Sequence, residues 1–268
     1  MLGLLDFVGD VNKLVASMSK LYDISIFDTF FEADFKDSID FEKTRLYIAD
    51  AYQANLDSYK PHKTTRIGIW LSDKEIWEGK PWFNGSICHL PASFDKIKYP
   101  KLNPKEASHY LLDLMHSTIM EFCEELKWEK SKFEQAYLKT LKNDLKYLKE
   151  YPVKTDRDKK NHAQVVVRKT QEYTIVYFRV NSMELKVYEI ENRFYEDPTD
   201  KFVSKNKWFD NNAFGICASV DEFRFFYSLA NNKLAYRIDP KYADENNLKK
   251  RFKKIIDQIE PATNTVFM

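Results

Sequence analysis

The sequence predicts an α+β protein. Its N-terminal half is expected to be helix-rich with a small β element, and its C-terminal half to be an antiparallel β-meander with a C-terminal helix. Two observations carry this prediction. Apolar residues recur every three or four positions through most of the first 150 residues, the period of a helix with one buried stripe. After residue 162 the period changes to two, which is typical of strands that bury one face.

The length of 268 residues suits one large domain or two small ones. We expect two parts, residues 1–150 and residues 151–268. The segment 151–161, YPVKTDRDKKN, differs from its surroundings because it is charged and contains Pro152. We interpret this segment as a surface link between the two parts.

Four helices are predicted in the N-terminal half. Apolar spacing alone indicates the first two, over residues 5–22 and 41–59. The third has the clearest start, since Asn103 can cap free backbone amides, Pro104 suits the first helical position and Glu106 can complete a capping box. The fourth, over residues 132–150, is expected to pack against the third as a helical hairpin.

The small β element is predicted between the second and third helices, over residues 66–90. Residues 66–71 alternate enough to form a strand, and Asn84-Gly85 is a tight-turn dipeptide. In the C-terminal half, strands are predicted over residues 163–170, 173–180, 184–191, 213–220, 222–230 and 233–238. Asp239-Pro240 is expected to open a final helix that Pro261 ends.

The totals restrict the possible functions. The 42 basic and 41 acidic residues leave a net charge of +1, which speaks against a nucleic-acid binder or a protein of anionic membranes. The three cysteines are far apart, so a disulfide framework is not expected and a cytoplasmic location fits. No stretch resembles a signal peptide or a membrane span. Phosphate-cradling glycine motifs are absent, and we expect no cofactor.

One candidate for chemistry is the polar face of the third helix. Glu106, His109, Asp113 and His116 follow one another at three, four and three residues, so they share one face of a helix. Such groups can hold a metal ion or exchange protons. The two histidines are two helical turns apart, however, or about 10 Å along the axis. An ordinary solvated helix face explains the same spacing.

A second candidate is the outer face of the first meander. Turns at residues 171–172 and 181–182 place Arg168 opposite Ile175, and Ile175 opposite Tyr188. Tyrosine and arginine interleaved on a sheet make a good surface for binding a partner. The residues predicted to bind it are Arg168, Tyr173, Tyr177, Arg179, Glu184, Lys186 and Tyr188. The alternative is that cross-strand pairs such as Arg179 and Glu184 only stabilise an exposed sheet, or that a helix covers it.

A third candidate is the group of Trp70, Trp77 and Trp82, near Cys88 and His89. Tryptophans can line a ligand pocket or contact a partner, but the interpretation we favour is that they fill the core of a chain with few glycines. Cys88 and His89 do not suggest a thiol nucleophile with its base, because neighbours in a strand point to opposite faces.

The sequence therefore favours a protein that recognises another macromolecule, most simply a protein, over an enzyme. An immunity or inhibitor protein that neutralises a toxin is one form of this hypothesis. Three alternatives remain open: a metal-assisted hydrolase using His109, Asp113 and His116; a single-stranded RNA binder using aromatic residues on its strands; and a scaffold that associates with itself. The sequence does not determine an oligomeric state.

Overall fold

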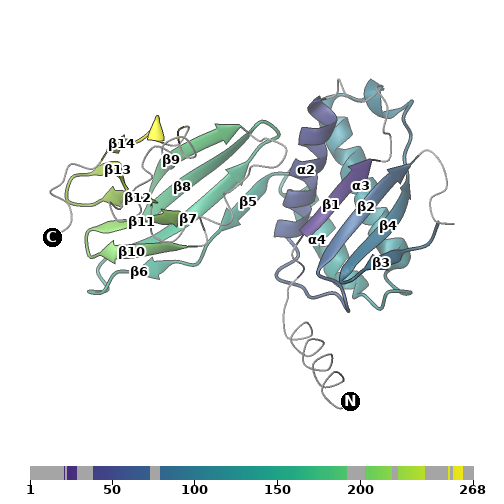
Figure 1. Ribbon diagram of the computed structural model, residues 1–268, viewed down its shortest axis with the longest axis horizontal. Coiled ribbons are helices and arrows are strands. Elements are labelled where there is room, and N and C mark those ends of the chain that lie inside the picture. The colour runs from purple at the N-terminus through teal and green to yellow at the C-terminus, as the bar shows by residue number, and fades with distance from the viewer. Residues whose placement is uncertain are drawn as a thin grey trace, which may run out of the picture. The chain divides into compact units, whose positions relative to one another are not determined.

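The computed structural model divides into two compact units, Met1–Lys146 and Tyr147–Met268, each described here by itself (Figure 1). The structure describes residues 21, 23–28, 39–72, 79–191, 203, 205–218, 223–238, 253 and 256–261. The helix predicted over residues 5–22 lies almost entirely outside these residues. No helix of the described part combines the length and the apolar character needed to cross a bilayer.

A four-stranded mixed sheet forms the centre of the first unit, in the order β1-β2-β4-β3. Its strands are β1 (Asp23–Asp28), β2 (Arg66–Ser72), β3 (Trp82–Asn84) and β4 (Ile87–Ser93). β1, β2 and β4 run parallel, and β3 pairs antiparallel with β4 through the turn predicted at Asn84-Gly85. Gly85 has a φ of 61°, which glycine adopts without strain.

Three α-helices of the described residues cover one face of this sheet. They are α2 (Ile39–Ala54), α3 (Pro104–Phe122) and α4 (Lys130–Lys142). In Figure 1 the sheet faces the viewer and α3 and α4 lie behind it. Ile67, Ile69 and Leu71 of β2 point to the helices and are at most 1% exposed, whereas Trp70 points to the other face. A 3-10 turn at Tyr99–Lys101 leads into α3, which begins with the predicted capping box.

The second unit is a sandwich of two sheets. One sheet has the order β5-β7-β8-β9 with β6 also beside β7, and the other has the order β10-β11-β12-β13-β14. The strands of the first sheet are β5 (Tyr147–Glu150), β6 (Lys154–Thr155), β7 (His162–Lys169), β8 (Tyr173–Val180) and β9 (Met183–Glu191). Those of the second are β10 (Asn206–Asp210), β11 (Ala213–Ala218), β12 (Phe223–Ser228), β13 (Lys233–Ile238) and β14 (Glu260–Pro261).

Aromatic rings join the two sheets of the sandwich. Phe178 meets Phe214 edge to face at 5.4 Å between ring centroids, and Tyr188 meets Phe225 at 5.7 Å. All four side chains are at most 1% exposed. Burying rings of this size supplies much of the free energy that holds two sheets together.

The predicted helix-rich N-terminal half is wrong, because a sheet lies at its centre and the described residues of the chain include more strand than helix. Parallel strands that are buried read as short apolar runs rather than as alternating patterns, so the extent of this sheet was underestimated. The helix predicted over residues 132–150 is also too long. α4 ends at Lys142, the positive φ angles of Asp144 and Leu145 turn the chain, and β5 follows.

The description of the C-terminal part as a meander closed by a helix is wrong as well. The last described element is β14, in which Pro261 lies beside Tyr236 of β13. Most residues of the predicted helix, including 239–252, lie outside the described part of the chain. The segment interpreted as a link, residues 151–161, contains β6 and therefore belongs to the sandwich.

Candidate functional site

Three of the four residues proposed as metal ligands on α3, namely Glu106, Asp113 and His116, are engaged in other contacts. The Glu106 carboxylate accepts a hydrogen bond from the backbone N–H of Asn103 at 2.9 Å, so it caps the helix. Asp113 accepts a hydrogen bond of 2.7 Å from the hydroxyl of Tyr137 on α4. This bond, together with burial, raises the pKa of Tyr137 to about 12. The Glu106 carboxylate therefore stabilises the start of α3, and the Asp113 carboxylate links α3 to α4.

His116 lies between helices rather than on an outer face. Its ring stacks on Tyr137 at 4.1 Å, and its Nδ1 lies 3.1 Å from the hydroxyl of Tyr52 on α2. Tyr52 donates its own proton to the carbonyl of Phe133, so Nδ1 of His116 is the donor in this contact. Burial lowers the pKa of His116, against the raising effect of Glu134 and Asp113, and favours the neutral ring.

These contacts leave no metal site. Within the described residues, no three His, Cys, Asp or Glu side chains come close enough together to hold an ion. In the part of the chain that the structure describes, no cluster of metal-binding side chains therefore supports the hydrolase hypothesis. The expectation that this face of α3 is simply solvated is also inaccurate, since His116 helps to pack three helices together.

The outer face of the β5-β7-β8-β9 sheet carries most of the residues predicted to bind a partner. The predicted register between β7 and β8 is confirmed, with Arg168 opposite Ile175 and Gln164 opposite Arg179. The predicted pairing of Arg179 with Glu184 is confirmed too. Positive φ angles at Asn181 and Ser182 make the tight turn that sets this register.

A network of ion pairs runs across this face. Arg179 contacts Glu150 of β5 at 2.9 Å and Glu184 of β9 at 3.1 Å, and these hydrogen bonds raise its pKa. Glu184 also contacts Arg168 at 2.7 Å. The guanidinium of Arg168 lies 4.5 Å from the ring centre of Tyr177, within the range of a cation–π contact. Side-chain contacts thus link β5, β7, β8 and β9, in addition to the backbone hydrogen bonds of the sheet.

Tyr188 is the one predicted binding residue that does not lie on this face. A β-bulge after Val176 shifts the register, so that Tyr188 pairs with Val176 and is 1% exposed in the sandwich core. Glu189 lies opposite Ile175, the position that was predicted for Tyr188. The bulge adds one residue to β9, and one extra residue sends each following side chain to the other face.

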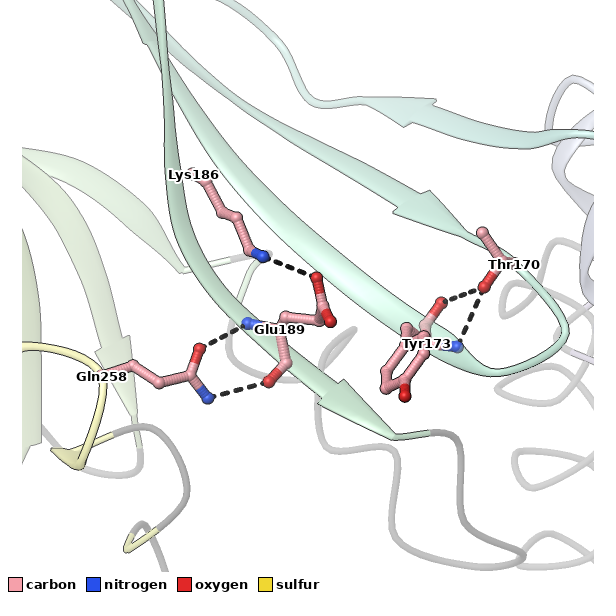
Figure 2. A network of polar contacts seen from close by, with 5 residues as sticks. All are labelled: Thr170, Tyr173, Lys186, Glu189 and Gln258. Carbon is pink, nitrogen blue, oxygen red and sulfur yellow. Dashed lines mark hydrogen bonds and ion pairs between the residues drawn. The ribbon is translucent and has the colours of Figure 1, made fainter.

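Gln258 binds the outer edge of β9 next to this bulge (Figure 2). The side-chain amide of Gln258 accepts from the backbone N–H of Glu189 and donates to its carbonyl, both at 2.9 Å. The Glu189 carboxylate reaches back to Lys186 at 2.6 Å. Figure 2 also shows the β7–β8 turn, where the Thr170 hydroxyl accepts from the backbone N–H of Tyr173 at 3.0 Å.

Exposure identifies the parts of this face that a partner can reach. The side chains of Lys186 and Arg168 are 52% and 42% exposed, and Tyr173 is 44% exposed. Leu148, on the neighbouring β5, is 49% exposed. Sequence reasoning missed Leu148 and Glu150, because the apolar spacing assigned both to the end of a helix. The adjacent Asn143 and Asp144, residue types that favour helix ends and turns, could have indicated an earlier helix end.

The tryptophan cluster lies on the sheet face of the first unit that points away from the helices. The indole N–H of Trp70 donates to Nδ1 of His89 at 2.8 Å, and Trp82 stacks on His89 at 5.1 Å. Phe27 stacks on Trp70 at 5.0 Å and is 37% exposed. Gly68 lies beneath, where a Cβ would approach His89 to 2.9 Å. Trp77 lies outside the described residues.

This cluster does not fill the core, so the interpretation favoured from the sequence is wrong. Because an indole N–H only donates, Nδ1 of His89 accepts and Nε2 carries the proton. Burial lowers the pKa of His89, which favours this neutral form. Cys88 points to the opposite face and is fully buried, where desolvation raises its pKa to about 12. The pair therefore cannot act as nucleophile and base, as the alternation of a strand predicts.

Comparison with known proteins adds no family to this geometry: no family model, no curated protein and no solved structure matches the chain significantly.

Proposed function

We propose that the protein recognises another protein and binds it on the outer face of the β5-β7-β8-β9 sheet. One observation supports a protein partner over a nucleic acid. The three cations of this face, Arg168, Arg179 and Lys186, are each paired with a carboxylate of the same face. A polyanion gains affinity by neutralising its phosphates against cations, and here the cations are already balanced. The RNA hypothesis is weakened by the same pairs.

The remaining surface of this face suits a protein. Leu148 and Tyr173 are close to half exposed and supply apolar area, and Arg168 is held between Glu184 and the ring of Tyr177. Tyrosine and arginine are enriched among the residues that dominate protein interfaces. Side chains already held in place lose less conformational entropy when a partner binds.

A matched pair of leucines tests the proposal. Leu148 is 49% exposed on this face, and Leu138 is 57% exposed on α4 of the other unit. Because both side chains face water, replacing either by arginine should leave the fold intact. We expect Leu148→Arg to weaken capture of the partner about 30-fold or more, the effect of losing a dominant contact, and Leu138→Arg to leave it unchanged.

The measurement is affinity capture by the full chain from the lysate of its own cells, followed by mass spectrometry and titration of the captured protein. Circular dichroism of both variants verifies that they fold. Equal capture by the two variants would remove this face from the proposal. A toxin inhibitor, one form of the proposal, predicts a one-to-one complex. We place this activity in the cytoplasm, where free cysteines such as Cys88, Cys123 and Cys217 persist.

A further inference from the structure

A cleft of about 410 Å³ lies in the second unit, on a different part of the sandwich from the face described above. It opens between β6 and β10, which run side by side in Figure 1. Its lining includes Lys154, Arg157, Trp208, Phe209, Asp210 and Asn211. This volume lies within the range of sites that bind small molecules.

Hydrogen bonds between the two strands fix the walls of the cleft. The indole N–H of Trp208 donates to the carbonyl of Lys154 at 2.9 Å, and the ammonium of Lys154 donates to the carbonyl of Asn206. On the other side, the Asn211 amide donates to Asp158 at 2.9 Å. The cleft is therefore formed before any ligand arrives, which lowers the entropic cost of binding.

The loop that carries Arg157 is also held. Asp156 is 4% exposed and accepts hydrogen bonds from the backbone N–H of Lys160 at 2.8 Å and from the side chain of Asn161 at 2.7 Å. Arg157 itself is exposed at the cleft and forms no hydrogen bond or ion pair with any residue that the structure describes. Its guanidinium is thus available to an anion.

Trp208 supplies the aromatic wall of the cleft. Its ring packs on Phe214, whereas the ring of Phe209 packs on Phe226, which lies on the opposite face of the sheet. The register of β10 shifts between Trp208 and Asp210. Bulges of this kind redirect side chains and are common beside binding sites. The consequence here is that aromatic surface, the Asp210 carboxylate and the Asn211 amide gather within one stretch.

We infer that this cleft binds a nucleoside monophosphate. A guanidinium binds phosphate oxygens through two parallel hydrogen bonds, which assigns the phosphate to Arg157. Indole rings stack on nucleobases, which assigns the base to Trp208. The carboxylate of Asp210 can accept from an amino group of the base or from a ribose hydroxyl.

The lining also limits the ligand to one phosphate. Its charged groups are Lys154, Arg157 and Asp210, and the ammonium of Lys154 is already bonded within the wall. Binding of di- and triphosphates usually relies on a glycine-rich loop whose backbone amides surround the phosphates, and the lining contains no glycine. A planar ligand with a single phosphate matches both the guanidinium of Arg157 and the indole ring of Trp208.

The test is isothermal titration of the full chain with AMP, GMP, CMP and UMP, with adenosine and inorganic phosphate as separate arms. We expect at least one nucleotide to bind, and adenosine and phosphate to bind about tenfold more weakly or worse. Arg157→Ala should weaken nucleotide binding about tenfold and leave adenosine binding unchanged. Lys160→Ala removes an exposed cation of the same loop outside the cleft, and should change the affinity less than twofold.

Three results would overturn the inference: no binding of any of the four nucleotides at millimolar concentration, equal losses in Arg157→Ala and Lys160→Ala, or phosphate binding as tightly as the nucleotides. Leu148→Arg separates this site from the proposed protein interface, because it should leave nucleotide binding unchanged. A loss of nucleotide binding in Leu148→Arg, with its fold intact, would also contradict the inference.

Discussion

The ion network on the outer sheet face predicts a specific loss of stability when Glu184 becomes glutamine. Glu184 is the only carboxylate that contacts both Arg168, at 2.7 Å, and Arg179, at 3.1 Å, among the described residues. Glu184→Gln keeps the size of the side chain and removes its charge. Arg179 then retains Glu150, whereas Arg168 retains the ring of Tyr177.

The size of the effect follows from exposure. The side chains of Arg168, Arg179 and Glu184 are 42%, 32% and 27% exposed, so each pair is partly screened by water. Partly exposed pairs contribute up to about 1 kcal/mol, and two of them are lost, which predicts a decrease of about 1 kcal/mol in the free energy of unfolding. Glu189→Gln, which breaks one pair with the 52% exposed Lys186, should cost about 0.3 kcal/mol.

Urea denaturation of the full chain, followed by circular dichroism, measures both variants. The difference between Glu184→Gln and the wild type should shrink in 0.5 M salt, where the Debye length falls to about 4 Å, because salt screens exposed charges. The reasoning fails if Glu184→Gln costs no more than Glu189→Gln, or if salt leaves its effect unchanged. Either result would mean that these side chains lie together without stabilising the sheet.

Three further predictions follow from buried groups. Burial lowers the pKa of His116, so the folded state binds fewer protons than the unfolded state, and stability should fall as the pH drops below about 6.5; His116→Gln should flatten this dependence in urea titrations between pH 7 and 5, and an unchanged dependence would contradict the reasoning. Gly215→Ala would place a Cβ 2.1 Å from a backbone oxygen of β12 and should cost about 3 kcal/mol, more than Gly68→Ala, whose nearest obstacle is a movable side chain; similar urea midpoints for the two would contradict this. The three cysteines are buried, so Ellman's reagent at pH 8 should detect no thiol in the native protein and three in urea; rapid reaction of any native thiol would show that its burial is transient.

Much of the local structure was predictable from short stretches of sequence. The cap at Asn103 and Glu106 depends on residues three positions apart, and the β7–β8 register depends on a turn and on alternating valines next to it. The outer positions of Arg168, Tyr173 and Tyr177 followed from the same alternation. In each case the contacts that decide the structure lie within about twenty residues, so the pattern is visible in one segment.

The binding surfaces required more than local pattern. The bulge in β9 that removes Tyr188 from the outer face is one inserted residue, and its one mark in the sequence is the adjacent pair Val187 and Tyr188, where the alternation of β9 changes phase. Leu148 reached the same face only because α4 ends early and β5 pairs with β7. The cleft beside Arg157 brings together residues about fifty positions apart, on two different sheets.

By itself the sequence determined the β7–β8 hairpin of the first meander, the capped start of α3 and the opposite directions of Cys88 and His89. These features depend on near neighbours, through backbone periodicity and short hydrogen bonds. Only the tertiary structure decided that a mixed sheet lies at the centre of the first unit, that Tyr188 belongs to the core, and that Leu148 and Glu150 of β5 join the outer face. Those outcomes depend on which distant strands pack together, and packing is settled by the apolar area that the whole chain can bury rather than by any one segment.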